Sequence, residues 1–478
     1  MQGKVWVSEA FMTGYTHDTY ISTFTWRYGS DAMRSIYSEE HKRKLLRQVW
    51  IALATAQRDA DLVTEEQLRE LIAHKDDIDI DRASEIEAEI HHDLMAEIKT
   101  YAEQCPKGGS IIHLGATSMD ILDNMDAMRL KEAMALTLKN VKILLEAFIE
   151  KMDSYAEKAC MAFTHIQPAE PTTVGYRFAQ TTQDLVEDLK ALQDVYGSIR
   201  GKGMKGAVGT SASYCELLKG TGITPFEMEA KVMDQLGLKA FTAATQVYPR
   251  KQDWRIVSAL SGLCCTLYKF FIDFRILQSP PIGEWSEPFG SKQVGSSAMP
   301  FKRNPINSEK IDSLCRFVSS QSEVLWQNAA STLLERTLDD SANRRFVLPE
   351  CFLATDEILM TATKVIRGMQ IHETGIKRNL DTYGLFAASE RLMMELGRKG
   401  ANRQEMHELI RNHSLKAWSE VQEGRPNPLA ASLKTDPVVL SFMTEDEVLA
   451  SLDAEGYVGD APKRTRLVID EAKAAIGK

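Results

Sequence analysis

The sequence predicts an all-α protein built around a central bundle of long helices. Apolar residues recur every three or four positions over long stretches. No run of alternating apolar and polar residues bounded by turn dipeptides indicates a strand. From Ala116 to Gln167 there is neither glycine nor proline, which leaves room for a helix of roughly 35 residues, about 50 Å long. Such a helix suits an elongated bundle better than a small globule.

Four further segments carry the same periodicity and complete the expected bundle: 174–199, 253–278, 305–331 and 347–369. Broad apolar faces on such long helices favour burial between subunits. A helix buried inside a monomeric core would show the same pattern. Because 478 residues exceed one ordinary domain, we expect three: an N-terminal helical domain at 1–117, the central bundle at 118–370, which includes the loop at 295–305, and a small C-terminal helical domain at 371–478.

Composition argues against several classes of function. The net charge of −10 disfavours nucleic acid or an anionic membrane as the main partner. The N-terminus lacks the basic-then-apolar build of a signal peptide, and no run of 18 uncharged apolar residues predicts a membrane span. The seven cysteines fit no zinc spacing, so we expect reduced core cysteines in a cytoplasmic protein.

Residues 295–305, which read GSSAMPFKRNP, carry the strongest chemical signal. Lys302 and Asn304 offer a point charge and a neutral donor, a combination suited to a substrate carboxylate. Gly290 and Gly295 bracket the preceding segment, as expected for a loop that opens and closes. Serine is a weak base on its own. Ser296 would become basic only if backbone N–H groups and nearby positive charge stabilised its oxyanion.

This string resembles the serine-loop signature of the fumarase/aspartase superfamily, whose members eliminate fumarate from succinyl-bearing substrates. The blocks at 115–124 and 164–172 resemble its other two signatures and stand in the same order. The string LERTLDDSANRR at 334–345 resembles the animal-type branch of the adenylosuccinate lyases, one family of this superfamily. The resemblance implies a fumarase/aspartase-like fold and a homotetramer with active sites shared between subunits. It implies no metal and no organic cofactor.

The implied activity is carbon–nitrogen bond cleavage in purine biosynthesis. Adenylosuccinate would give AMP and fumarate, and the succinyl-carboxamide ribotide SAICAR would give AICAR and fumarate. The expected partners are the nucleotide substrate and other copies of the chain, with neither nucleic acid nor membrane. Two alternatives stay open. One is another fumarate-releasing enzyme such as argininosuccinate lyase, which would not need residues that bind a nucleotide phosphate. The other is an inactive structural homologue that kept only the fold.

The resemblance also implies catalytic roles for individual residues. Ser296 matches the catalytic base and His165 the general acid that protonates the departing purine nitrogen, while Lys302 supplies positive charge. The alternatives are that Ser297 acts instead, that both serines only shape a turn, or that the histidine is structural. His92 is implied to contact the substrate and to orient the catalytic histidine.

Further residues match substrate contacts of the family. Those expected to bind the succinyl group are Thr117, Ser118 and Asn304, although Thr117 and Ser118 could instead be a plain helix cap. Gln246 is expected to contact either the succinyl group or the base. Those expected to bind elsewhere on the substrate, mainly on the nucleotide, are Arg27, Tyr28, His92, Asp93, Lys310, Arg336, Ser341 and Arg345. Guanidinium groups among them suit the phosphate, which they bind bidentately. Arg344 could be a surface charge.

The motifs contain three further features: a pair of histidines and two departures from the family pattern. The run His91-His92-Asp93 could suggest a metal site, but adjacent histidines do not share a helix face and no third ligand is evident. Lys310 stands where the family commonly has a substrate-contacting arginine. The positive charge is therefore kept, but the planar guanidinium group, which can donate two parallel hydrogen bonds, is lost. We expect an altered affinity for one of the two substrates. His91 stands where animal-type enzymes tend to have arginine, and it would weaken any substrate contact there.

Overall fold

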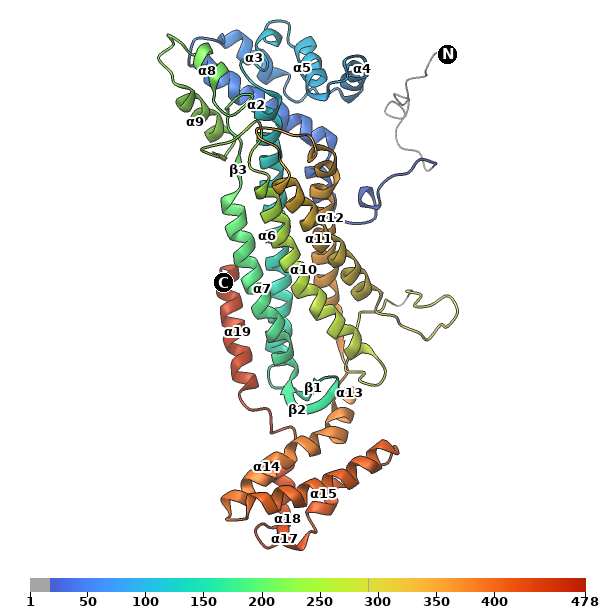
Figure 1. The fold of residues 1–478 in the computed structure, drawn as a ribbon. Helices are drawn as coiled ribbons and strands as arrows, with labels where there is room; N and C mark the ends of the chain where they lie inside the picture. The colour runs from blue at the N-terminus through green and yellow to red at the C-terminus, as the bar shows by residue number, and fades with distance from the viewer. Residues whose placement is uncertain (1–17, 291) are drawn as a thin grey trace. The chain divides into compact units, whose positions relative to one another are not determined.

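The computed structural model describes residues 18–290 and 292–478, and helices dominate it (Figure 1). Two compact units can be distinguished. Of the described residues, unit 1 contains those up to Asn140 together with 191–264 and 314–358, and unit 2 contains those in 141–190, in 265–313 and from Leu359 onwards. The three-domain division expected from the sequence stays a prediction.

The five long helices are present and confirm the all-α fold class. They are α6 (Ser118–Ser154), α7 (Val174–Ser198), α10 (Lys251–Gln278), α11 (Ile306–Ala330) and α12 (Ser341–Gly368). Each contributes residues to both units. Helix α12 begins six residues before the expected start at 347, because Arg344 is the one buried residue of positions 341–346 and it is ion-paired rather than apolar. Apolar periodicity cannot detect such a turn.

Unit 1 adds short helices around the beginning of α6. They are η2 (Thr23–Thr25), α1 (Asp31–Ile36), α2 (Glu39–Arg58), α3 (Glu65–Ala73), α4 (Ile80–Ile90), α5 (Asp93–Gln104), η3 (Gly109–Ile111), α8 (Ala212–Leu217) and α9 (Pro225–Gln235). Helix α2 packs against α3 and α9, and α4 packs against α5 (Figure 1). Thr64 and Thr224 begin α3 and α9 with complete capping boxes. The short strands β3 (Arg200–Gly201) and β4 (Lys239–Ala240) pair in parallel.

Unit 2 has an aromatic core and a cluster of smaller helices. Phe148, Phe178 and Phe270 come from three long helices and pack against one another, and Trp285 lies 4.9 Å from the ring of Phe178. Strand β5 (Trp285–Ser286) pairs with β6 (Gln370–Ile371). The remaining elements are α13 (Glu373–Asn379), η4 (Leu380–Gly384), α14 (Leu385–Arg398), α15 (Arg403–Gln422), α16 (Leu429–Leu433), α17 (Pro437–Leu440), α18 (Glu445–Ser451) and α19 (Ala461–Ile476).

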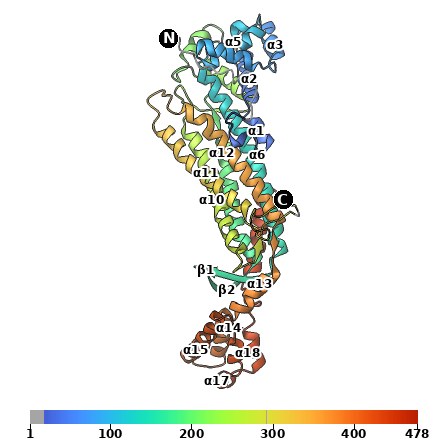
Figure 2. The same cartoon turned by 90° about the vertical axis from the view of Figure 1, so that its right-hand side faces the viewer.

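One antiparallel hairpin was not expected from the sequence. Strands β1 (Ala159–Thr164) and β2 (Gln167–Thr173) pair beside α13 (Figure 2). The turn between them consists of His165 and Ile166, with φ of 54° and 59°. Two-residue hairpin turns of this kind favour Asn-Gly or Asp-Gly, so a His-Ile pair gives no turn signal. The scarce strand signal of the sequence therefore missed this hairpin.

Within the described residues, α10 alone is long and apolar enough to cross a membrane, judged by length and composition only. Buried side chains make up 44% of its most apolar window, and Phe270 and Phe274 on this helix pack on Trp285. The core helix of a protein outside the membrane has the same composition. The seven cysteines are all free, and five of them are buried; Cys215 and Cys265 are exposed.

Candidate active site

The serine loop is fixed at its base by Glu287. The buried carboxylate of Glu287 accepts hydrogen bonds from the backbone and side chain of Asn307, at 3.2 and 2.7 Å, and from the backbone and hydroxyl of Ser308, both at 2.7 Å. These donors lie in the first turn of α11, whose free N–H groups a carboxylate stabilises. The residues between Glu287 and Asn307 therefore form a loop with a closed base.

Within this loop, the hydroxyl of Ser296 lies in a cradle of backbone donors. Its Oγ accepts hydrogen bonds from the N–H groups of Ala298, at 3.3 Å, and of Met299, at 3.1 Å. Ser296 is half-buried, whereas Ser297 is exposed. Two N–H groups aimed at one oxygen would stabilise negative charge on it, although such bonds also shape ordinary serine turns. The geometry favours Ser296 over Ser297 as the base.

Lys302 and Asn304 close the same loop. The N–H of Lys302 donates to the carbonyl of Met299 at 3.0 Å, and the side chain of Asn304 donates to the carbonyl of Gly295 at 3.3 Å. A Cβ at Gly295 would lie 2.1 Å from the carbonyl oxygen of Lys302, so only glycine permits this close approach. The side chain of Lys302 is exposed and Asn304 is half-buried, which leaves both available to a substrate carboxylate.

His165 occupies the tip of the β1–β2 hairpin. It is exposed, and both turn residues have positive φ, which is uncommon for histidine and a clear outlier for the β-branched Ile166. Ile166 itself is 65% exposed. A strained turn that presents an exposed histidine is more typical of a functional position than of a structural one.

His92 begins α5 and has a defined hydrogen-bonding state. Its Nδ1 accepts a hydrogen bond from the N–H of Met95 at 3.3 Å. A ring nitrogen that accepts carries no proton, so in the neutral imidazole the proton is on Nε2, which can act as a donor. His91, with φ of 56°, ends α4 in the left-handed conformation. The two histidines thus serve opposite helix ends, and no group of three His, Cys, Asp or Glu suited to a metal occurs among the described residues.

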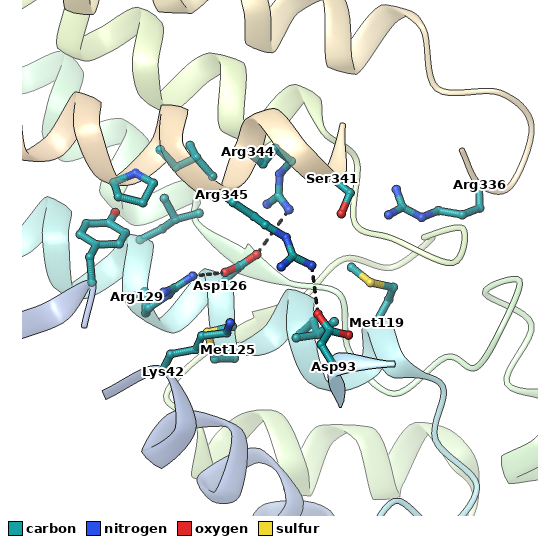
Figure 3. A pocket seen from close by; sticks show the side chains of 15 residues that line it. Lys42, Asp93, Met119, Met125, Asp126, Arg129, Arg336, Ser341, Arg344 and Arg345 are labelled. Carbon is teal, nitrogen blue, oxygen red and sulfur yellow. Dashed lines mark hydrogen bonds and ion pairs between the residues drawn. The ribbon is translucent and has the colours of Figure 1, made fainter. Parts of the chain in front are cut away.

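A pocket that is partly open to solvent lies entirely in unit 1. It brings together four of the residues expected to bind the substrate: Asp93, Arg336, Ser341 and Arg345 (Figure 3). Arg345 Nη2 lies 3.0 Å from Asp93 Oδ2. Burial opposes ionisation of Asp93, but hydrogen bonds from the Leu94 N–H and Arg345 outweigh it and hold the pKa of Asp93 below its ordinary value.

Sequence reasoning missed several residues that line this pocket, including Lys42, Met119 and Arg129. Lys42 is one of three consecutive basic residues on α2, and nothing in the sequence distinguishes it from its neighbours. Arg129 lies along α6, where its spacing from Asp126 suggests only a salt bridge within the helix, and that bridge is present at 2.7 Å.

Arg344 is not a surface charge, contrary to the sequence-based alternative. It is only 8% exposed, and its guanidinium donates to Asp253 at 2.7 Å and to the hydroxyl of Tyr248 at 2.8 Å. Arg250 extends the same buried network to Asp123 and Asp340. Because consecutive helix residues point in different directions, the anchored Arg344 helps to aim its neighbour Arg345 into the pocket (Figure 3).

The start of α6 is capped by Asp120, not by Thr117 or Ser118. The fully buried carboxylate of Asp120 accepts from the N–H of Thr117 at 3.1 Å and pairs with the buried Lys202 at 2.6 Å. Among the described residues, neither hydroxyl of Thr117 and Ser118 makes a hydrogen bond. Both are half-buried. The plain-cap alternative is therefore weakened, and both hydroxyls stay available to an anion at this helix end.

The remaining expected contacts do not line the pocket. Arg27 is exposed, with its guanidinium 5.8 Å from the ring of Tyr28. The N–H of Gln246 donates to the carbonyl of Glu335 at 3.1 Å, which joins its segment to the one that carries Arg336. Lys310 is half-buried in α11. The roles assigned to all these residues stay predictions.

Comparison with known proteins identifies the relatives of this chain. A family model described as lyase matches residues 14–319, and a model described as the C-terminus of adenylosuccinate lyase matches residues 386–468. An adenylosuccinate lyase from Schistosoma mansoni is 39% identical over 424 residues, 88% of each chain. One from Pyrococcus abyssi is 37% identical and covers 93% of this chain and 96% of its own, and one from Saccharomyces cerevisiae is 33% identical over 95% of each.

Solved structures support the fold. A 3-carboxy-cis,cis-muconate lactonizing enzyme from Pseudomonas putida aligns with a TM-score of 0.84 and 23% identity, covering 95% of this chain and 99% of that one. A fumarate lyase from Mesorhizobium sp. BNC1 aligns with a TM-score of 0.81 and 20% identity over the same fractions. The fold is thus that of the fumarate lyases, and the matches to both family models and to full-length relatives show that the chain is a lyase and belongs to the adenylosuccinate lyase family.

Proposed function

We propose that this chain cleaves adenylosuccinate to AMP and fumarate, and SAICAR to AICAR and fumarate. The observation that carries the proposal is the cradle around Ser296, in which two backbone N–H groups point at one hydroxyl oxygen. This arrangement suits an oxygen that bears charge during catalysis. The family membership supplies the substrate class.

The reaction needs a base, an acid and a stabiliser of negative charge. Deprotonated Ser296 removes the proton next to a succinyl carboxylate, and its charge beforehand is stabilised by the N–H groups of the loop and by Lys302. The electron pair moves into the carboxylate and then forms the double bond of fumarate as the carbon–nitrogen bond breaks. His165 donates a proton to the departing nitrogen. Lys302 and Asn304 hold the carboxylate on which charge develops.

Substrate recognition is proposed to divide between two sets of residues. Arg345 and Ser341 bind the ribose phosphate, and Thr117, Ser118 and Gln246 bind the succinyl group. The residues of the two sets and of the serine loop act on one substrate. The protein is a homotetramer whose active sites are shared between subunits, and it is located in the cytoplasm.

The test is fumarate release by the purified chain in the presence of a metal chelator. Adenylosuccinate and SAICAR should both be cleaved, whereas malate and argininosuccinate should not. Release from argininosuccinate alone would move the chain to another branch of the superfamily. No release from any of the four would make it an inactive homologue. Light scattering of the same sample should give four times the mass of one chain.

A further inference from the structure

Lys42 is a pocket residue without an assigned role. It lies on α2 and lines the same pocket as Asp93, Ser341 and Arg345 (Figure 3). We propose that Lys42 is a second phosphate-binding cation, which acts together with Arg345 on the ribose phosphate of the substrate. This inference rests on the proposed function and extends it by one specific contact.

The pocket has more positive than negative charge. Five cations line it but only two carboxylates, Asp93 and Asp126. Three of the cations are neutralised by carboxylates. Arg129 pairs with Asp126, Arg336 with Asp340 and Arg344 with Asp253, each at 2.7 Å. Arg345 has Asp93 at 3.0 Å.

Lys42 is the lining cation with the weakest partner. Its Nζ lies 3.5 Å from Glu39, a carboxylate that is 61% exposed and is held more closely by Arg43, at 2.6 Å. A contact of 3.5 Å on a helix surface contributes little. The side chain of Lys42 is only 25% exposed, so its stem is packed while its ammonium group is left for another anion.

The chemistry around Lys42 fits a phosphate monoester better than a carboxylate. Ser341 begins the 28-residue helix α12, whose N-terminal end favours an anion, and the pocket adds the guanidinium of Arg345 and the ammonium of Lys42. A phosphate dianion has three acceptor oxygens, so it can accept hydrogen bonds from a hydroxyl, a planar guanidinium and an ammonium group at the same time. Asp93 pairs with Arg345 in the structure described here, and a phosphate would compete with it for that guanidinium.

The experiment compares Lys42→Met with Lys42→Arg, and uses Lys44→Met as the matched control. Lys44 lies on the same helix, pairs with Glu40 at 2.6 Å and does not line the pocket. For Lys42→Met we expect KM to rise about 10-fold for adenylosuccinate and for SAICAR alike, because both carry the phosphate, with kcat within about twofold. The inhibition constant of inorganic phosphate against adenylosuccinate should rise by a similar factor. Lys42→Arg should restore most of the affinity.

Other outcomes would overturn the inference. An unchanged KM, a fall in kcat with KM unchanged, or an unchanged inhibition constant for phosphate would each show that Lys42 does not hold this group. A thermal melt of each variant separates these outcomes from misfolding, since a structural role would lower the melting temperature and would not be rescued selectively by arginine. Failure of the proposed function would appear differently, as wild-type protein that releases no fumarate.

Discussion

The two adjacent serines of the loop offer a direct test of the catalytic assignment. Ser296→Ala removes an oxygen that accepts two backbone hydrogen bonds, whereas Ser297→Ala removes an exposed hydroxyl one residue away. One backbone donor aimed at a developing charge contributes a factor of about 10² to 10³ in kcat. Ser296→Ala removes the base and also the oxygen whose charge both donors stabilise. It should therefore lower kcat by at least about 10³-fold, which corresponds to an activation free energy raised by roughly 4 kcal/mol.

The same substitution should hardly affect folding. The two hydrogen bonds of Ser296 lie in a loop where water replaces them, so their net contribution to the free energy of unfolding is about 1 kcal/mol or less. Fumarate release and a denaturant titration on both variants separate the two effects. We expect Ser297→Ala to stay within about threefold of wild-type activity. The reasoning is refuted if Ser297→Ala is the damaging change, or if Ser296→Ala keeps a tenth of the activity.

Three further predictions concern stability. Ile166→Gly relieves a positive φ on a β-branched residue and should raise the free energy of unfolding by about 1 kcal/mol in a denaturant titration; no gain would mean that the turn is unstrained. Burial raises the pKa of Asp188 to about 6, against the hydrogen bond from Thr266. The folded state therefore holds this proton more tightly, and stability should fall by about 2 kcal/mol as pH rises from about 4 to about 6; Asp188→Asn, compared by melting across that range, should lack this loss. Arg344→Met leaves Asp253 buried without its cation and should cost about 3–5 kcal/mol in chemical denaturation; a cost below about 1 kcal/mol would contradict the buried network.

The long helices and the fold class could be predicted from the sequence because their apolar stripes are long enough to outweigh local exceptions. The start of α12 was misplaced for the opposite reason. In its first turn only Arg344 is buried, paired with the carboxylate of Asp253, and a hydropathy pattern scores an arginine as exposed. The β1–β2 hairpin was not predicted because its turn consists of two residues that rarely adopt positive φ.

In the candidate site too, the sequence motif predicted some features, whereas others are visible only in the three-dimensional structure. The serine string predicted Ser296 as the reactive hydroxyl. The cradle around Ser296 depends on backbone N–H groups, which every residue except proline possesses, so no residue type could reveal it. The charge balance of the pocket was equally hidden. Arg344 and Arg345 are identical neighbours in sequence, yet Arg344 is buried and neutralised while Arg345 is 65% exposed at the pocket.

The contrast between those two arginines bears on the proposed binding of a phosphate in the pocket. A buried cation with its own carboxylate contributes rigidity but little net attraction, because the network it belongs to is already neutral. Cations that remain weakly paired at the surface of that network provide the attraction, and the network fixes their positions beforehand. In this chain Arg344 is of the first kind and Lys42 of the second. Removal of the first should therefore be detected mainly as lost stability, and removal of the second mainly as a raised KM.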